Sequence, residues 1–489
     1  MKKCFFCLLS FLGIINLSAQ TRLTLEQCRI MALDHDKQVA ISKEQVIQAE
    51  AKKKAARAAY LPKIDANAAF IYSSRNISLL AEDKFAPVGT VMSDGSFGFT
   101  PEQVNNGWTM VGGQPVPLDA NGQPFNPKTN PEKIEWKGYA YLPKDEFTVD
   151  MSHSFFGTVG LTQPVFMGGK IREYNKIADF AQALAQTQLT AKQTEVLYDV
   201  EESYWQVVSL THKLKIANEY KTLMNKLDAN LQAMNEEGMA TKNDVLKVKV
   251  RLNEVDVSLT KAGNGLRLSK MALCRMIGLP LDSDIEVDET FDIESNTSAY
   301  GIEMWKNRPE LQSLDYLSQI ARSKVRVAQA GYLPTVGITA GYLVANPNPY
   351  NGFTPGFAAN FTVAAVLQMP IFHWGEKRQQ VKIAHSEHNI AKIKREEAVE
   401  KMELQYTQAF LRVEEAVKLK SSAEKNLEQA EENLRYANIG FEEGVVQTAS
   451  VLEAQAAWFS AVSELADARI EAQLARVYLN KVSGTLIKK

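Results

Sequence analysis

A glycine pair followed by lysine, at residues 167–170 (Met-Gly-Gly-Lys), is the first feature with a composition suited to chemistry. A loop that binds phosphate through its backbone amides needs another glycine at position 164, where this chain has Pro164. A nucleotide site is therefore not predicted. The chain also lacks a nucleophile elbow and a persuasive catalytic pair of carboxylates, so we predict no enzymatic activity and no cofactor.

Two histidines are the only other candidates for chemistry that the sequence brings close together. His385 and His388 are three residues apart in a segment predicted to be helical, and they could share a metal ion with His373 or Glu387. A zinc site needs three or four ligands at suitable spacing. No zinc-hydrolase pattern accompanies the pair and no third ligand follows at helical spacing. A solvated helix face is the favoured interpretation, and no metal is predicted.

Long stretches without proline dominate the chain. The seventeen prolines are absent from residues 165–279 and again from residues 371–489. Because a proline inside a helix costs about 3 kcal/mol, these stretches, which are rich in Ala, Glu, Lys and Gln, predict long helices. As one helix, residues 170–237 would extend for about 100 Å, at about 1.5 Å per residue. Such helices must bury their apolar stripe against other helices.

The two proline-free stretches are copies of one unit. Pro164, Gly238, Leu246 and Gly278 recur as Pro370, Gly444, Leu452 and Gly484, each 206 residues later (370 − 164). Neither copy has therefore gained or lost length relative to the other. From Val451 to Leu479 apolar residues alternate three and four apart, which is typical of a coiled coil. The sequence predicts two long helical hairpins of equal length, with turns near residues 238 and 444.

Four further segments of about ten residues alternate apolar with polar side chains, which indicates strands. Their length fits membrane-spanning strands, but it also fits an ordinary antiparallel sheet packed on helices, and periodicity alone leaves both interpretations open. Four strands leave two edges, so membrane strands would need several chains to close one barrel. The apolar positions are Ile64, Ala66, Ala68, Phe70 and Tyr72; Phe155, Gly157, Val159 and Leu161; Val336, Ile338, Ala340, Tyr342 and Val344; Phe361, Val363, Ala365 and Leu367.

The remaining segments complete the domain organisation. Residues 1–20 are predicted to be a secretory signal peptide, because two lysines precede a short apolar run and small residues. Residues 21–279 form the first structural repeat, with an insertion at about 74–152 that holds eight prolines and is expected to be an irregular surface loop. Residues 280–300 are an acidic linker, and residues 301–489 form the second repeat.

Charge and cysteine content exclude two classes of protein. The formal net charge is −2, which does not suit a nucleic-acid-binding surface, so no nucleic-acid partner is predicted. Cys28 and Cys274 are the only cysteines after the signal segment, too few and too distant for a disulfide framework. Whether they are free thiols stays open. The residues before Cys28 do not suit lipid attachment.

The order of these segments resembles the TolC-like outer-membrane efflux family. The residues that carry the resemblance are Asn307-Arg308-Pro309-Glu310-Leu311, the two strand entries Tyr60-Leu61-Pro62 and Tyr332-Leu333-Pro334, residues 163–169, and the two hairpin turns. The resemblance covers nearly the whole mature chain, and the long insertion is the main departure from it.

The resemblance implies a mainly α protein with a membrane β-barrel. Three chains of four strands each would form a twelve-stranded barrel in the outer membrane, continued by an α-barrel of coiled-coil hairpins in the periplasm. The protein would be the passive exit duct of a tripartite efflux or type I secretion system. Its partners would be two further copies, a periplasmic adaptor, an inner-membrane pump and outer-membrane lipid. A periplasmic coiled-coil protein without a channel is the alternative.

The resemblance also implies functional roles for the hairpin turns. The family's constricting acidic positions fall on Ser450 and Glu453 in the second turn, and the same steps in the first give Asp244 and Lys247. We hypothesise a periplasmic gate dominated by a ring of Glu453 near Asp244; the alternative is that these side chains are solvated charges on the helix surface. The family's gating arginine and tyrosine fall on Val446 and Phe441, so that lock is not expected here. The positions implied in adaptor docking are Gly238, Thr241, Leu246, Gly444, Val451 and Leu452.

Overall fold

The computed structural model describes residues 21–93, 95–288 and 303–488. The predicted signal peptide and most of the acidic linker, residues 289–300, lie outside the described residues. The chain divides into a helical unit, Met1–Ala59 with Gly168–Leu333 and Pro370–Lys489, and a β unit, Tyr60–Met167 with Pro334–Met369. Among the described residues, no helix combines the length and the apolar character needed to cross a bilayer.

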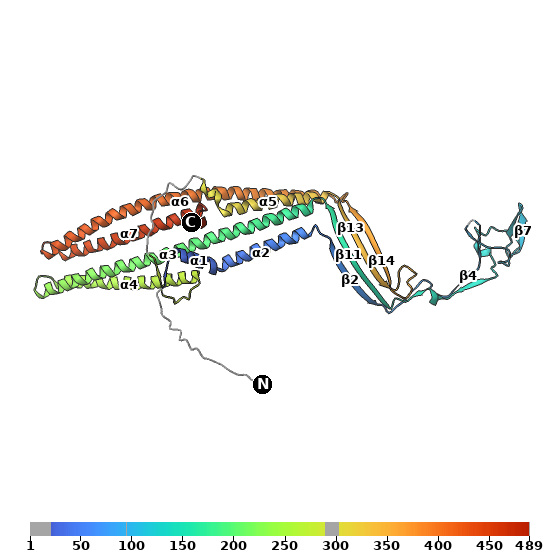
Figure 1. The fold of residues 1–489 in the computed structure, drawn as a ribbon, viewed down its shortest axis with the longest axis horizontal. Coiled ribbons are helices and arrows are strands. Elements are labelled where there is room, and N and C mark those ends of the chain that lie inside the picture. The colour runs from blue at the N-terminus through green and yellow to red at the C-terminus, as the bar shows by residue number, and fades with distance from the viewer. Residues whose placement is uncertain (1–20, 94, 289–302, 489) are drawn as a thin grey trace, which may run out of the picture. The chain divides into compact units, whose positions relative to one another are not determined.

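Two helical hairpins of matched length form most of the helical unit (Figure 1). The first consists of α3 (Lys170–Glu236) and α4 (Lys242–Ile277), and the second of α6 (Glu376–Glu442) and α7 (Thr448–Val482). Helices α3 and α6 each contain 67 residues, so each is about 100 Å long. Both first residues and both last residues are 206 apart, which confirms the duplication predicted from the sequence.

Three shorter helices accompany these hairpins. In the first half of the chain, α1 (Leu25–His35) and α2 (Lys37–Ala58) come before strand β2 (Lys63–Tyr72). In the second half, α5 (Pro309–Gln329) comes before strand β13 (Thr335–Asn346). Helix α5 lies between Met304–Asn307 and Ala330–Tyr332, two short 3₁₀-helices; a third, Leu486–Lys488, follows α7. Helix α2 packs against α3, and α5 packs against both α3 and α6.

The segment between Thr24 and Ala59 forms two helices, because the chain breaks at Asp36. Thr24 caps α1 in a capping box, in which Gln27 returns a hydrogen bond to the Thr24 backbone. Asp36 is extended (φ −62°, ψ 122°), and its carboxylate accepts hydrogen bonds of 2.8 Å from the backbone amides of Gln38 and Val39. An aspartate that satisfies two free amides starts a new helix.

A small parallel sheet, which was not predicted from the sequence, joins residues 21–23 to the linker. Strand β1 (Thr21–Leu23) pairs with β12 (Ile285–Val287). Their connection is completed by Tyr204 of α3, whose hydroxyl donates to the carbonyls of Leu23 (3.3 Å) and Asp288 (2.8 Å). Burial raises the pKa of Tyr204 to about 12, so the phenol stays protonated and remains a donor.

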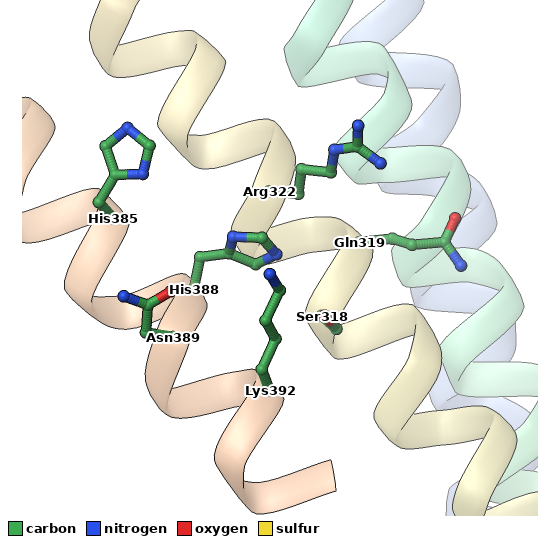
Figure 2. A pocket seen from close by; sticks show the side chains of 7 residues that line it. All are labelled: Ser318, Gln319, Arg322, His385, His388, Asn389 and Lys392. Carbon is green, nitrogen blue, oxygen red and sulfur yellow. The ribbon is translucent and has the colours of Figure 1, made fainter. Parts of the chain in front are cut away.

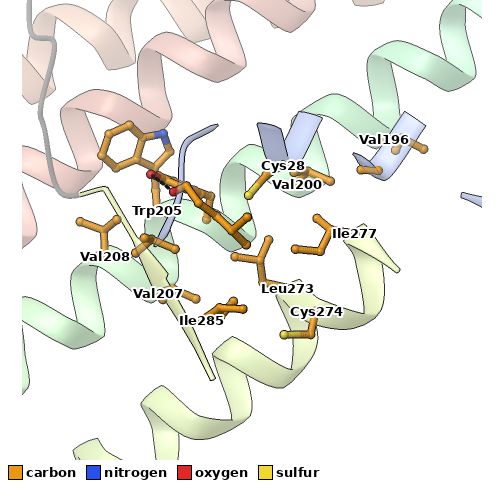
Figure 3. Close-up of a cluster of buried hydrophobic side chains, with 14 of the residues drawn as sticks. Cys28, Val196, Val200, Trp205, Val207, Val208, Leu273, Cys274, Ile277 and Ile285 are labelled. Carbon is orange, nitrogen blue, oxygen red and sulfur yellow. Dashed lines mark hydrogen bonds between the residues drawn. The ribbon is translucent and has the colours of Figure 1, made fainter. Parts of the chain in front are cut away.

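The main apolar cluster surrounds this small sheet (Figure 3). It draws side chains from α1, α2, α3, α4, α7 and both short strands, and Trp205 of α3 is part of it. Cys28 and Cys274 are completely buried in the same cluster and are both free. Burial, together with the neighbouring Cys274, raises the pKa of Cys28 to about 11. These thiols therefore pack as apolar side chains and are not reactive.

The β unit contains a four-stranded antiparallel sheet in the order β14-β13-β11-β2. Its strands are β2 (Lys63–Tyr72), β11 (His153–Met167), β13 (Thr335–Asn346) and β14 (Ala358–Gln368), as the alternating pattern predicts. Strands β2 and β14 each have one edge that no described strand covers. The register shifts between Pro164 and Phe166, where the missing amide of proline is tolerated in a bulge.

The register brings the four apolar sets onto one face of this sheet. Val159 lies between Ala66 of β2 and Tyr342 of β13, and Tyr342 in turn faces Phe361 of β14. Asn67, Thr158 and their cross-strand neighbours occupy the opposite face. The apolar face is not covered, since Phe70, Phe361 and Val363 are each more than 60% exposed.

The prediction of an irregular loop at residues 74–152 was wrong in one respect, because short strand pairs organise this insertion. Backbone pairing between segments far apart in the sequence is not visible in local periodicity. The pairs are β3 (Ile77–Ser78) with β10 (Thr148–Val149), β4 (Lys84–Pro87) with β9 (Tyr139–Leu142), β5 (Thr90–Val91) with β6 (Phe97–Gly98), and β7 (Trp108–Val111) with β8 (Gln114–Pro117). Two 3₁₀-helices, Pro131–Lys133 and Lys144–Phe147, complete the insertion.

We predict that a methyl group at Gly278 destabilises the protein more than one at Gly238. Both glycines follow a helix with positive φ (81° and 79°), so an alanine is strained by about 1 kcal/mol at either site. A Cβ at Gly278 would lie 2.5 Å from the His35 ring, whereas a Cβ at Gly238 would meet nothing within 4 Å. Gly278→Ala should cost a further 1–3 kcal/mol or so through this clash.

Thermal unfolding of the purified protein, followed by circular dichroism, measures this difference. Gly278→Ala should lower the Tm clearly more than Gly238→Ala, which serves as the matched control for backbone strain. Equal shifts would show that His35 moves away without cost.

Candidate functional site at the hairpin tips

The first hairpin tip is a tight, hydrogen-bonded turn between α3 and α4. Gly238 takes the left-handed conformation just after α3. The backbone amides of Met239 and Ala240 both donate to the carbonyl of Met234, at 2.8 Å and 3.2 Å. The side chain of Asn235 donates to the carbonyl of Ala240 at 2.7 Å. These bonds hold the tip in one conformation, so its exposed side chains are presented rigidly.

A cap and an ion pair start α4 at this tip. Thr241 accepts a hydrogen bond from the backbone amide of Asp244 (3.2 Å), and its hydroxyl donates to the Asp244 carboxylate. Lys247 Nζ lies 3.6 Å from the same carboxylate. The hydrogen bond from Thr241, with a smaller contribution from Lys247, lowers the pKa of Asp244. The ionised carboxylate of Asp244 therefore stabilises the fold fully above about pH 4. This stabilisation is lost as the pH falls through the lowered pKa of Asp244.

The second tip repeats the turn but not the cap. Gly444 is left-handed, and the amides of Val445 and Val446 donate to the carbonyl of Gly440 at 2.9 Å and 3.0 Å. Gln447 occupies the cap position of α7 and makes no capping hydrogen bond with its side chain. The two tips therefore share a backbone and differ in the chemistry that begins their second helix.

The predicted gate residues lie at the starts of α4 and α7. Ser450 and Glu453 are exposed, and Glu453 makes no ion pair or side-chain hydrogen bond within the described part of the chain. Asp244 and Lys247 pair with each other, and no hydrogen bond or ion pair between described residues joins them to the second tip. An apolar cluster containing Val245 of α4, together with Phe441 and Val451 of the second hairpin, connects the tips instead.

The predicted docking positions are not all accessible. Gly238, Thr241 and Gly444 are exposed, Leu246 is 51% exposed, and Leu452 is half-buried. Val451 is completely buried in the cluster between the hairpins, so its assignment to a docking surface has to be corrected. As the first position of the coiled-coil seam, it faces the neighbouring helices.

Two exposed apolar side chains at the tips were missed. Met239 is 64% exposed and Val445 is 79% exposed, and they occupy equivalent positions immediately after the two turn glycines. An apolar residue directly after a left-handed glycine, repeated in both copies, was the available sequence signal. Together with Leu246 they make the tips apolar, although the adjoining helix surfaces are charged.

Apolar packing occupies the place of the family's arginine and tyrosine lock. Phe441 is buried in the cluster between the tips, and Val446 packs against that cluster. A Cβ on Gly440 would lie 2.5 Å from a methyl carbon of Val446, so this glycine makes room for the valine. Between α3 and α7, Tyr220 and Phe459 stack with ring centroids 4.6 Å apart. Apolar contacts therefore hold the two hairpins together at this end.

The histidine pair lies elsewhere in the helical unit. His385 and His388 line a pocket with Arg322 and Lys392, and His373 is not among its lining residues. Within residues 21–93, 95–288 and 303–488, no three potential ligands of the His, Cys, Asp or Glu type converge on a metal position.

Sequence comparison identifies the family to which this architecture corresponds. Residues 144–279 and 303–485 match the family model described as "Outer membrane efflux protein", which covers well over half of the chain. The chain belongs to the outer membrane efflux protein family. The resemblance, the outer-membrane location and the role as an exit duct of efflux or secretion systems are thereby confirmed.

Individual members of the outer membrane efflux family agree with this assignment. The chain is 24% identical to the alkaline protease secretion protein AprF of Pseudomonas aeruginosa over 356 residues, which are 70% of this chain and 72% of AprF. The fold is similar to that of CusC (TM-score 0.71, 14% identity, 94% and 91% of the two chains). It is also similar to that of VceC from Vibrio cholerae (TM-score 0.70, 15% identity, 94% and 96%). The insertion up to residue 143 lies outside the family match.

We predict that Thr241→Val loosens the first tip and that Gln447→Val leaves the second unchanged. Loss of a capping side chain typically costs about 1 kcal/mol, which corresponds to about fivefold faster amide exchange if the tip opens locally. Gln447 occupies the equivalent cap position without a side-chain bond, so its replacement is the matched control. Hydrogen exchange of the peptides covering each tip, read by mass spectrometry, makes the measurement. Equal acceleration at both tips would contradict the capping role of Thr241.

Proposed function

We propose that three copies of this chain close one barrel through their β sheets and form a passive duct across the outer membrane. The observation that supports this most directly is the four-stranded sheet. It has one continuous apolar, uncovered face and two open edges, on β2 and β14. In lipid each unpaired backbone group costs several kcal/mol, so β14 of one copy has to pair with β2 of the next. Strands of ten to fifteen residues have the length needed to span the hydrocarbon core.

The face that turns toward lipid follows from the side chains. Tyr72, Phe70 and Ile64 on β2, and Phe361 and Val363 on β14, lie on the apolar face and are exposed in the single chain. Asp65, Asn67 and Thr158 lie on the other face, which suits the water-filled interior of a barrel. Lipid therefore covers the apolar face in the assembled duct.

The helical unit supports the same assembly. Helix α6 carries exposed apolar residues at Ile383, Ile390, Leu404 and Leu411, spaced seven or fourteen residues apart. Such a stripe at heptad spacing fits the seam of a coiled coil and needs a partner helix. In a trimer the neighbouring copy supplies this partner, and the hairpins enclose a tunnel on the periplasmic side.

The tips then provide the periplasmic end of the duct. Met239 and Leu246 at the first tip and Val445 at the second are exposed apolar side chains beside rigid turns. We infer that they form the docking surface for a helical adaptor, which links the duct to an inner-membrane pump. Thr241, Gly238, Gly444 and Leu452 border this surface. The duct itself performs no chemical reaction, and the pump and adaptor select its cargo.

We further propose that the gate is a ring of three Glu453 carboxylates near Asp244. The charge of Asp244 is shared with Lys247, whereas Glu453 has no cationic partner among the described residues. Three unpaired carboxylates around one axis repel each other and attract cations, so the ring favours cation passage. Ser450, one turn earlier, leaves the constriction without a second acidic ring.

We predict that Phe361→Lys prevents assembly in the outer membrane and that Thr362→Lys does not. The two residues are neighbours on β14 and are both exposed in the single chain, but they lie on opposite faces. A lysine facing the middle of the bilayer costs about 2–4 kcal/mol, whereas one facing water in the barrel costs little. The amount of detergent-stable trimer in the outer-membrane fraction measures the effect. Normal assembly of Phe361→Lys would contradict a lipid-facing sheet.

We also predict that Glu453→Gln weakens the cation selectivity of the channel. Removal of three carboxylates from the constriction should shift the reversal potential toward zero in planar bilayers under a salt gradient. Glu464→Gln, an exposed position about three turns further along α7, is the control and should leave the selectivity unchanged. An unchanged reversal potential in Glu453→Gln would rule out the proposed ring.

A further inference from the structure

A pocket of about 590 Å³ lies between α5 and α6, away from the hairpin tips. Figure 2 shows its lining residues: Ser318, Gln319 and Arg322 come from α5, and His385, His388, Asn389 and Lys392 come from α6. Its volume falls within the range of small-molecule sites in proteins. The side chains of His388 and Lys392 point toward one another across the α6 side of the pocket (Figure 2).

The charge of this pocket has one sign. Arg322 and Lys392 are permanent cations, the two histidines become cations when protonated, and no carboxylate lines the pocket. None of these four side chains forms an ion pair with another residue in the described part of the chain. Like charges that line one pocket repel each other, and a bound anion would relieve this repulsion.

Two of the three carboxylates near the pocket already have cationic partners. On α5, Asp315 pairs with Arg395 of α6 in the adjoining hollow, which Lys392 and Glu396 also line. Where α3 packs on α5, Glu173 already contacts Lys176 (2.6 Å) and Arg326 (3.7 Å). Burial, followed by Lys392, Arg322 and His385, lowers the pKa of His388. The electrostatic influence on His388 is therefore positive from both helices.

The duplicated first half shows that this charge is not required by the fold. With the 206-residue offset of α3 and α6, His385, His388 and Lys392 correspond to Asp179, Gln182 and Gln186. With the 272-residue offset between Tyr60 and Tyr332 (332 − 60), Arg322 corresponds to Glu50. In the first half Gln182 bonds to Glu50 (3.4 Å) and Asp179 pairs with Lys53 (3.0 Å). At equivalent positions, the first copy therefore has neutralised polar contacts between α2 and α3, whereas the second copy has four unpaired basic groups between α5 and α6.

We propose that this pocket binds a small multivalent oxyanion of the phosphate class, held by Arg322 and Lys392 and by His385 and His388 in their protonated forms. A guanidinium and an ammonium group both bind phosphate oxygens by charge-assisted hydrogen bonds, and two flanking imidazolium rings add donors. Ser318, Gln319 and Asn389 supply neutral donors around them. A monovalent carboxylate would leave most of the positive charge uncompensated, so a multivalent anion fits better.

The site is sensitive to pH because the anion and the protons favour each other. As the pH falls, protonation of His388 adds a positive charge to the pocket and binding becomes tighter. By reciprocity, the bound anion promotes protonation of His388, so binding takes up protons from solution. The pocket would therefore bind the oxyanion under acid conditions in the periplasm.

Isothermal titration of the intact protein in detergent with pyrophosphate tests the proposal. Binding should be about tenfold or more tighter at pH 5.5 than at pH 8, and Arg322→Gln and Lys392→Gln should each weaken it about tenfold or more. Lys394→Gln, an exposed position on α6 outside the pocket, is the matched control and should bind normally. Titrations at pH 6.5 in two buffers of different ionisation enthalpy should show proton uptake that is lost in the double variant His385→Gln/His388→Gln.

A second arm identifies the source of the phosphate group. A soluble short-chain phosphatidic acid is added as competitor: displacement of pyrophosphate at lower concentration than glycerol phosphate indicates a lipid headgroup, and equal potency indicates a free phosphate compound. The variants exchange exposed side chains, and an unchanged circular dichroism spectrum and unfolding temperature verify folding. Absence of binding at pH 5.5, or equal loss of affinity in Lys394→Gln, would overturn the proposal. These outcomes are independent of the duct proposed above, because the pocket lies within one chain.

Discussion

The free edges of β2 and β14 are the constraint on which the architecture depends. A backbone amide or carbonyl in lipid has no water with which to bond, so a sheet with two open edges is incompatible with a membrane unless other copies cover those edges. The uncovered apolar face makes the same sheet unsuited to water. Both features are resolved together when identical chains close a ring, and the long hairpins then have identical neighbours against which to bury their apolar stripes.

Equal length in the two halves follows from the same requirement. Helices α3 and α6 contain 67 residues each, and the turns at Gly238 and Gly444 lie at equivalent positions, so both hairpins end at the same level. An insertion in one copy would place one set of tips beyond the other and separate Val245 from Val451 in the cluster between them. Matched length therefore preserves the packing that joins the tips.

Side chains have diverged on this conserved frame. The first tip begins its second helix with the Thr241 cap and the Asp244–Lys247 pair, while the second begins with Gln447 and the unpaired Glu453. The pocket between α5 and α6 carries basic groups where the first half carries Asp179 and Glu50. Duplication supplied two equivalent geometries, and substitutions at a few exposed positions gave them different electrostatic properties.

Local features of the sequence determined the helices, the strands and the duplication. Proline-free stretches, three-and-four spacing and two-residue alternation report on neighbouring residues, and these features predicted α3, α4, α6, α7 and the four long strands. The glycines that recur in the two copies predicted the hairpin turns near residues 238 and 444. The resemblance supplied the gate and docking positions, although Val451 was assigned to a surface when its heptad position indicates burial.

Only the tertiary structure decided which side chains meet. The register of β11 with β2 and β13 collected the apolar sets on one face, and the pairing of β1 with β12 used residues more than 260 positions apart. The pairing of β4 with β9 in the insertion and the presence of Arg322 and His388 in one pocket also depend on packing between distant segments. Each is a non-local contact, and periodicity carries no information about which non-local partner a residue will find.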